Sequence, residues 1–131
     1  MTVVFGTIFV EPARRGHSAP CTYATAEEAH ALAEAQIAYY DRLARNCRQI
    51  ALVGNRLHLD GVLDSWQRGT PQVGILPLME GADPIREPSE LDWWVERGLR
   101  GVGLSWRAGS RYAGGDAAPG PLTDVGWALL E

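Results

Sequence analysis

The sequence predicts an α/β fold built on parallel strands. Residues 2–10, 73–79 and 99–106 are apolar runs with few polar side chains, a pattern typical of strands buried on both faces of a parallel sheet. Helical patterns with capping residues lie between these runs, and this alternation favours right-handed βαβ crossovers. The size, 131 residues of which 46% are hydrophobic and 21% charged, fits one globular domain or part of a larger one.

The first strand, residues 2–10, leads into a loop over residues 11–23. Thr25 and Glu28 then have the spacing of a capping box. The helix that follows has apolar residues at three- and four-residue spacings as far as Cys47, so one of its faces should be buried.

A short or irregular strand is expected at residues 50–53. Asn55 follows as the cap of a second helix that runs to about Arg68. The strand at residues 73–79 comes next and stops at Glu80. Functional groups in parallel sheets lie at the carboxyl ends of the strands, which makes Glu80 the first candidate site residue.

Ser89 should cap a third helix and Gly98 should end it. A strand over residues 99–106 and a glycine-rich loop over residues 107–121 follow, and Thr123 caps the last helix. The tryptophans on the expected helices should pack on the sheet; they are Trp66, Trp93, Trp94 and Trp127.

Composition excludes several functions. The net charge of −4 gives no basic surface for nucleic acid or an anionic membrane, and no apolar segment approaches the roughly 18 residues that span a bilayer. The first residues lack the basic region of a secretory signal. Cys21 and Cys47 are too few for a disulfide framework or a four-ligand zinc site, so we expect reduced thiols in a cytoplasmic protein.

Four segments of the second half of the chain form a recognisable pattern when taken in order. They are Met79-Glu80-Gly81-Ala82-Asp83, Glu96-Arg97-Gly98-Leu99-Arg100, Val102-Gly103-Leu104 and Gly120-Pro121-Leu122-Thr123-Asp124-Val125-Gly126. Together they resemble the membrane dipeptidase (renal dipeptidase) family, and residues 5–10 fit the family's preceding strand. The similarity is strongest from about residue 73 to residue 130.

This resemblance implies a (β/α)8 barrel and a hydrolase that cleaves dipeptides with two zinc ions. It assigns Glu80 as the carboxylate that bridges the two metals, and it aligns Trp106 with the family's substrate-contacting histidine. A complete barrel needs roughly 250 residues. Residues 1–131 would therefore form about half of a barrel, from the second to about the fourth βα unit, with no second domain.

The family's other metal ligands have no counterpart in this sequence. The family's His-x-Asp strand would lie before Met1, and two histidines and a late aspartate would lie after Glu131. We therefore expect a fragment, a truncated reading frame or a half-barrel that closes by self-association, and no dipeptidase activity from these residues alone. The alternative is a non-enzymatic half-barrel that forms a homodimer or docks onto a companion half.

The histidines have simpler interpretations. His58-Leu59-Asp60 mimics the His-x-Asp motif, but it falls in a predicted helix, where residues two apart face different ways. His17 lies in a loop and His30 on a helix surface, so both should be solvated.

The glycine-rich loop holds the last candidates. Arg107 and Arg111 can meet a substrate carboxylate near Trp106, or they are ordinary solvated arginines. Residues 114–116, two glycines and an aspartate, lack the strand-to-helix context of a phosphate cradle, so a flexible loop is expected there. A third hypothesis is a small-molecule binding module on residues 107–121.

Overall fold

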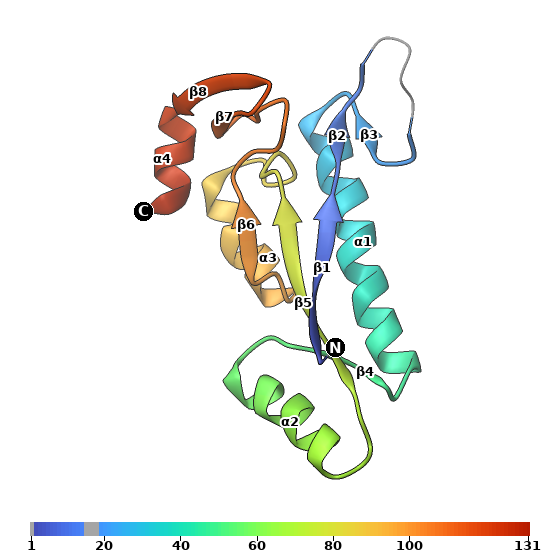
Figure 1. Cartoon of the computed structure of the whole chain (residues 1–131). Coiled ribbons are helices and arrows are strands. Elements are labelled where there is room, and N and C mark those ends of the chain that lie inside the picture. Colours follow the sequence, from blue (N-terminus) through green and yellow to red (C-terminus); the bar gives the residue numbers. More distant parts are fainter. Residues whose placement is uncertain (1, 15–18) are drawn as a thin grey trace.

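The computed structural model describes residues 2–14 and 19–131 and has an α/β fold with a parallel sheet (Figure 1). The sheet contains β1 (Val3–Phe9), β4 (Ile50–Leu52), β5 (Val73–Glu80) and β6 (Gly101–Gly103). Strand β5 is central. Strand β1 pairs with it along residues 74–80, β4 with its first residues and β6 with its last residues, and all of these pairings are parallel.

The strands of the described residues do not close into a barrel. Although β4 precedes β5 in the chain, it does not lie between β1 and β5. Instead, β4 and β6 share the second edge of β5, one at each end. The predicted α/β class with parallel strands is confirmed, and the half-barrel stays an expectation.

Of the four α-helices in residues 2–14 and 19–131, three begin at the predicted caps. In α1 (Ala26–Asn46), the Thr25 hydroxyl accepts a hydrogen bond from the Glu28 N–H, and the Glu28 side chain completes the capping box. Asn55 caps α2 (Arg56–Gln67) by accepting the His58 N–H. Thr123 caps α4 (Asp124–Leu130) by accepting the Gly126 N–H. Short polar side chains at these positions satisfy backbone N–H groups that the helix itself leaves unpaired.

The third helix starts differently. A 3₁₀ turn, η1 (Pro88–Glu90), precedes α3 (Leu91–Glu96), and Ser89 lies inside that turn instead of capping the helix. The prediction for Ser89 is wrong because Pro88, with its fixed φ, starts the turn one residue earlier. Gly98, at φ +104°, follows α3 as predicted.

Two predicted loops contain strands. Residues 11–23 include β2 (Glu11–Pro12) and β3 (Thr22–Tyr23), which pair in parallel. Residues 107–121 include β7 (Ala113–Gly115) and most of β8 (Ala118–Leu122), which form an antiparallel hairpin. The strand predicted at residues 99–106 is reduced to β6. The hairpin glycines serve close packing, since a Cβ on Gly114 would lie 2.1 Å from the Gly120 nitrogen.

One face of the sheet is covered by α1 and α3. Ile8 and Met79 project from β1 and β5 toward these helices, and both are fully buried with Ala33 of α1 and Trp94 of α3. Helix α2 lies at the amino end of the sheet, and the hairpin with α4 lies near the carboxyl end of β6 (Figure 1).

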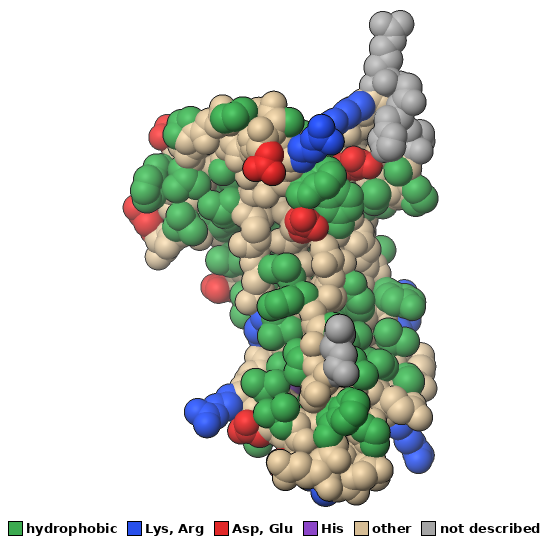
Figure 2. Space-filling view, viewed as in Figure 1, with side chains coloured by type: hydrophobic (Ala, Val, Ile, Leu, Met, Phe, Trp, Pro, Cys, Tyr) green, Lys and Arg blue, Asp and Glu red, His purple; other side chains and the backbone are tan. Residues whose placement is uncertain are grey.

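The opposite face is open. Alternate residues of β1 and β5 face this side, and we call the set Phe5, Phe9, Leu76, Leu78 and Glu80 the open sheet face. Phe5 is 68% exposed and the others are partly exposed. In Figure 2, hydrophobic side chains run along the middle of the molecule, where Figure 1 places β1 and β5.

The tryptophans divide into two groups. Trp94 is fully buried and Trp93 packs edge-on against it at 4.9 Å between ring centroids. Trp66 and Trp127 are 44% and 58% exposed, so the prediction that they pack on the sheet is wrong. Trp66 instead donates its indole N–H to the Gln72 carbonyl. Helix α4 buries Leu129 rather than Trp127.

No helix in the part of the chain that the structure describes combines the length and hydropathy of a membrane span.

Candidate functional site

Glu80 is the last residue of the central strand. Its register partners are Phe9 of β1 and Gly103 of β6, so three parallel strands reach the same end of the sheet around it. Gly103 adds no side chain at this register position. Within residues 2–14 and 19–131, no hydrogen bond or ion pair engages the Glu80 carboxylate, which is partly exposed.

Trp106 lies next to this strand end. Its ring packs edge-on against Phe9, with 4.8 Å between the ring centroids and an interplanar angle of 79°. The side chain is 40% exposed and borders a pocket of about 290 Å³ that Arg107 also lines. The structure therefore places Trp106 and Arg107 together, beside the strand end that carries Glu80. The rest of this pocket is formed by Ser105, Gly114, Gly115, Asp116, Pro119 and Gly120.

Arg111 lies elsewhere. Its guanidinium donates to the carbonyls of Ile85 and Arg86, at 2.8 and 2.6 Å, and its backbone N–H donates to Asp83. These bonds hold the loop after β5 against the loop after β6. Arg111 does not line the pocket of Trp106 and Arg107.

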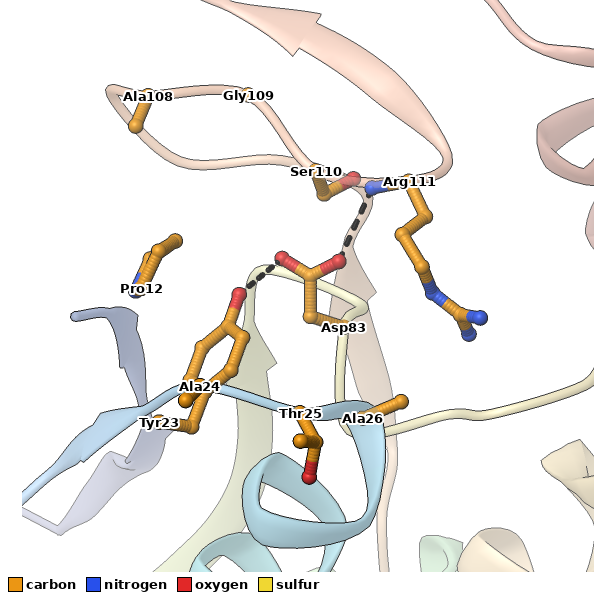
Figure 3. Close-up of a pocket in the computed structure, with 10 residues that line it drawn as sticks. All are labelled: Pro12, Tyr23, Ala24, Thr25, Ala26, Asp83, Ala108, Gly109, Ser110 and Arg111. Carbon is orange, nitrogen blue, oxygen red and sulfur yellow. Dashed lines mark hydrogen bonds between the residues drawn. The ribbon is translucent and has the colours of Figure 1, made fainter.

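A second pocket at the same end of the sheet has a volume of about 360 Å³ (Figure 3), and we call it the Asp83 pocket. It lies between the amino end of α1, the β2–β3 pair and the loops that follow β5 and β6. Its lining residues are Pro12, Tyr23, Ala24, Thr25, Ala26, Asp83, Ala108, Gly109, Ser110 and Arg111.

Asp83 is the central polar group of this pocket. Its Oδ2 accepts the Tyr23 hydroxyl at 2.6 Å, and its Oδ1 accepts the Arg111 backbone N–H at 3.0 Å (Figure 3). Burial, followed by the hydrogen bond to Asp83 and the negative charge of that carboxylate, raises the pKa of Tyr23 above its ordinary value. Neither Tyr23 nor Asp83 is among the site residues predicted from the sequence. The available signal is that Asp83 closely follows the carboxyl end of a parallel strand.

The described residues do not fit a two-zinc site. No group of three His, Cys, Asp or Glu side chains in residues 2–14 and 19–131 could hold a metal ion. His58 lies on α2, as predicted, and its Nδ1 accepts the Gly54 N–H, while Asp60 faces Arg56 at 3.7 Å. His58 and Asp60 therefore interact with different residues, Gly54 and Arg56.

The other histidines and the cysteines do not add ligands. His30 is buried, with Nδ1 3.0 Å from the Pro84 carbonyl and 3.7 Å from the Glu90 carboxylate. The prediction of a solvated His30 is wrong because the loop after β5 and α3 pack over that part of α1. Cys21 and Cys47 are free and partly exposed, and His17 lies outside the described residues.

No protein-family model matches this chain, and no curated protein sequence matches it. The resemblance to the membrane dipeptidases therefore rests on the four sequence segments and on the position of Glu80.

Proposed function

We propose that this chain is a dipeptidase-like half-barrel unit that supplies Glu80 as the bridging carboxylate of a two-zinc peptidase site. One observation supports this most: Glu80 ends the central parallel strand and no described residue uses its carboxylate. Two available oxygens and a full negative charge suit a ligand shared by two cations. The remaining ligands would come from polypeptide other than these residues, in the same chain or in a companion.

The residues present take part in substrate binding rather than in a catalytic step. Because only one of the required ligands is in place, we assign no metal-dependent step to them. Trp106 has an indole N–H but no basic nitrogen, so it can pack against a substrate but cannot accept a proton. Arg107, in the same pocket, supplies a positive charge for a substrate carboxylate.

The coding DNA on either side of this sequence tests the proposal. We expect a His-x-Asp strand upstream and histidine-bearing strands downstream. In the polypeptide that includes them, Glu80→Gln should abolish zinc-dependent dipeptide hydrolysis, whereas Glu87→Gln, at an exposed loop carboxylate, should preserve it. Full activity in Glu80→Gln, or the absence of such strands from the same transcript and from neighbouring genes, would refute the proposal.

The open sheet face favours a second function, that of a self-associating or partner-docking half-barrel. Parallel sheets are normally covered on both faces, yet Phe5 is 68% exposed and the neighbouring Leu76 and Leu78 are only partly buried. A second copy or a companion half placed over this face would remove these side chains from water. Each side chain of that size that becomes fully buried contributes roughly 1.5–3 kcal/mol. This function requires no metal.

A further inference from the structure

We propose that the Asp83 pocket binds a protonated primary amine. Asp83 lines the pocket with its carboxylate partly exposed, and no Arg or His side chain of the described residues lies within ion-pair distance of it. Arg111 also lines the pocket, but its guanidinium points away from Asp83 (Figure 3). It donates to the carbonyls of Ile85 and Arg86. The Asp83 carboxylate therefore lines the pocket without forming an ion pair with a described side chain.

The hydrogen-bonding capacity of Asp83 matches an ammonium group. An ionised carboxylate can accept about four hydrogen bonds, and Asp83 accepts one from Tyr23 and one from the Arg111 backbone. An ammonium group has three N–H donors and no acceptor. Because the Tyr23 hydroxyl already donates to Asp83, its own oxygen is left as a further acceptor beside the carboxylate.

Charge in the pocket disfavours anions. The pocket contains the amino end of α1, which would attract an anion, but Glu28 already occupies that position. Its Oε2 accepts the N–H groups of Ala24 and Thr25, at 2.6 and 3.3 Å. An anion in the pocket would therefore meet the Asp83 carboxylate, and these two N–H groups are already engaged. A metal ion would find a single carboxylate, since the described residues contain no cluster of three ligands.

The walls and the size restrict the body of the ligand. Pro12, Ala24, Ala26 and Ala108 give the pocket apolar sides, and its volume of about 360 Å³ lies near the lower end of the range for small-molecule sites. A short aliphatic or peptidic body fits this description. The amine can belong to a free alkylamine or to the amino terminus of a short peptide. The inference is independent of the proposed function, since it uses neither Glu80 nor a metal.

Amide NMR of the full chain tests the inference without a substitution, because the Arg111 backbone N–H donates to Asp83 and reports on that carboxylate. Propylammonium chloride and Ala-Ala should each shift the Arg111 resonance to saturation, and acetyl-Ala-Ala should not. Tighter binding of Ala-Ala would identify a peptide amino terminus as the ligand, and tighter binding of propylammonium would identify a free amine. No saturable shift with either amine, or an equal shift with the acetylated peptide, overturns the inference.

A charge-removing variant gives a second test. Asp83→Asn keeps one side-chain oxygen as an acceptor but loses the charge, so the affinity for propylammonium should fall about 10-fold or more. Asp60→Asn, on α2 outside the pocket, is the matched control and should bind as the wild type does. Unchanged affinity in Asp83→Asn overturns the inference. If that variant does not fold, the amine-induced shifts of the Arg111 amide resonance in the wild type decide whether the inference holds.

Discussion

Among the residues of the candidate sites, Tyr23 has the pKa that is shifted furthest from its ordinary value. Burial, then the hydrogen bond to Asp83 and its charge, raise the pKa of the phenol above 10.0. We predict that Tyr23 stays protonated at pH 10, where an ordinary phenol is half ionised. The phenolate ultraviolet absorbance of the wild type and of Tyr23→Phe should therefore be nearly equal at that pH. An excess in the wild type of about half a phenolate would contradict the hydrogen bond.

The same shift affects stability at high pH. The folded state holds the Tyr23 proton more tightly than the unfolded state does, so this contribution is fully present below pH 10 and is lost as the pH rises through the raised pKa. The free energy of unfolding should fall more steeply above pH 10 in the wild type than in Tyr23→Phe.

The site residues differ in how far the sequence predicts them. Glu80 is predictable because an acidic residue that ends an apolar strand lies where parallel sheets carry their functional groups. Asp83 follows the same strand end, but its pairing with Tyr23 is not predictable, because Tyr23 lies 60 residues away in the chain and only the fold brings the two together. Arg111 is separated from Arg107 because its guanidinium binds the carbonyls of Ile85 and Arg86. The positions of those carbonyls also depend on the fold and cannot be predicted from composition or spacing.

At the scale of secondary-structure elements, two helical glycines allow a matched test of packing. A Cβ on Gly126 of α4 would lie 2.1 Å from the Tyr112 carbonyl oxygen, whereas a Cβ on Gly61 of α2 meets nothing within 4 Å. We predict that Gly126→Ala lowers the free energy of unfolding by about 1–3 kcal/mol through overpacking. Gly61→Ala should raise it by up to about 1 kcal/mol through helix propensity. Urea denaturation measures both, and equal effects would contradict the packing of α4 on the hairpin.

Gln36 of α1 takes the place of a neighbouring strand at the edge of β1. Its side-chain amide accepts the Phe9 N–H at 2.9 Å and donates to the Phe9 carbonyl at 2.8 Å. Strand β1 pairs only with β5 in the described part of the chain, so this edge would otherwise carry unpaired backbone groups.

Removing this amide should therefore destabilise the fold. We predict that Gln36→Ala lowers the free energy of unfolding by about 1–2 kcal/mol. Glu34→Ala, at an exposed residue of the same helix, should change it by less than about 0.5 kcal/mol. Urea denaturation that shows no difference between the two variants would mean that the edge of β1 does not need Gln36.

The elements follow the sequence wherever local chemistry determines them. The Thr25, Asn55 and Thr123 caps act within one helical turn, so their residues suffice to locate α1, α2 and α4. The β7–β8 hairpin depends on backbone contact between Gly114 and Gly120. In the sequence, the same glycines indicate flexibility, which is why residues 107–121 are predicted as a loop.

At the scale of the whole molecule, the open sheet face determines the association state in the second proposed function. That proposal predicts that the chain sediments as a discrete oligomer. Phe5→Ser should shift it to a monomer, because Phe5 is the most exposed member of this face. Leu57→Ser, which replaces a 77% exposed side chain on α2, should leave the oligomer intact. A wild-type monomer at all concentrations would eliminate self-association.

The sheet edges also limit how a barrel could be completed. A further strand that pairs with Phe9 must displace the Gln36 amide, and one that pairs with Thr7 must displace the Tyr40 hydroxyl, which donates to the Thr7 carbonyl at 2.9 Å. Strand β6 pairs only with β5 among the described residues and offers the second edge. A companion half that pairs with the β1 edge must therefore rearrange these α1 side chains.

Zinc-dependent dipeptide hydrolysis by the 131-residue chain is the most direct test of the account, because its central claim is that these residues provide a single ligand, Glu80, of a two-metal site. The measurement compares the wild type with Glu80→Gln, with zinc stoichiometry followed by equilibrium dialysis. We predict no turnover in either protein and no bound pair of zinc ions. Turnover by the wild type that disappears in Glu80→Gln would contradict the claim, because it would show that a complete site exists within this chain.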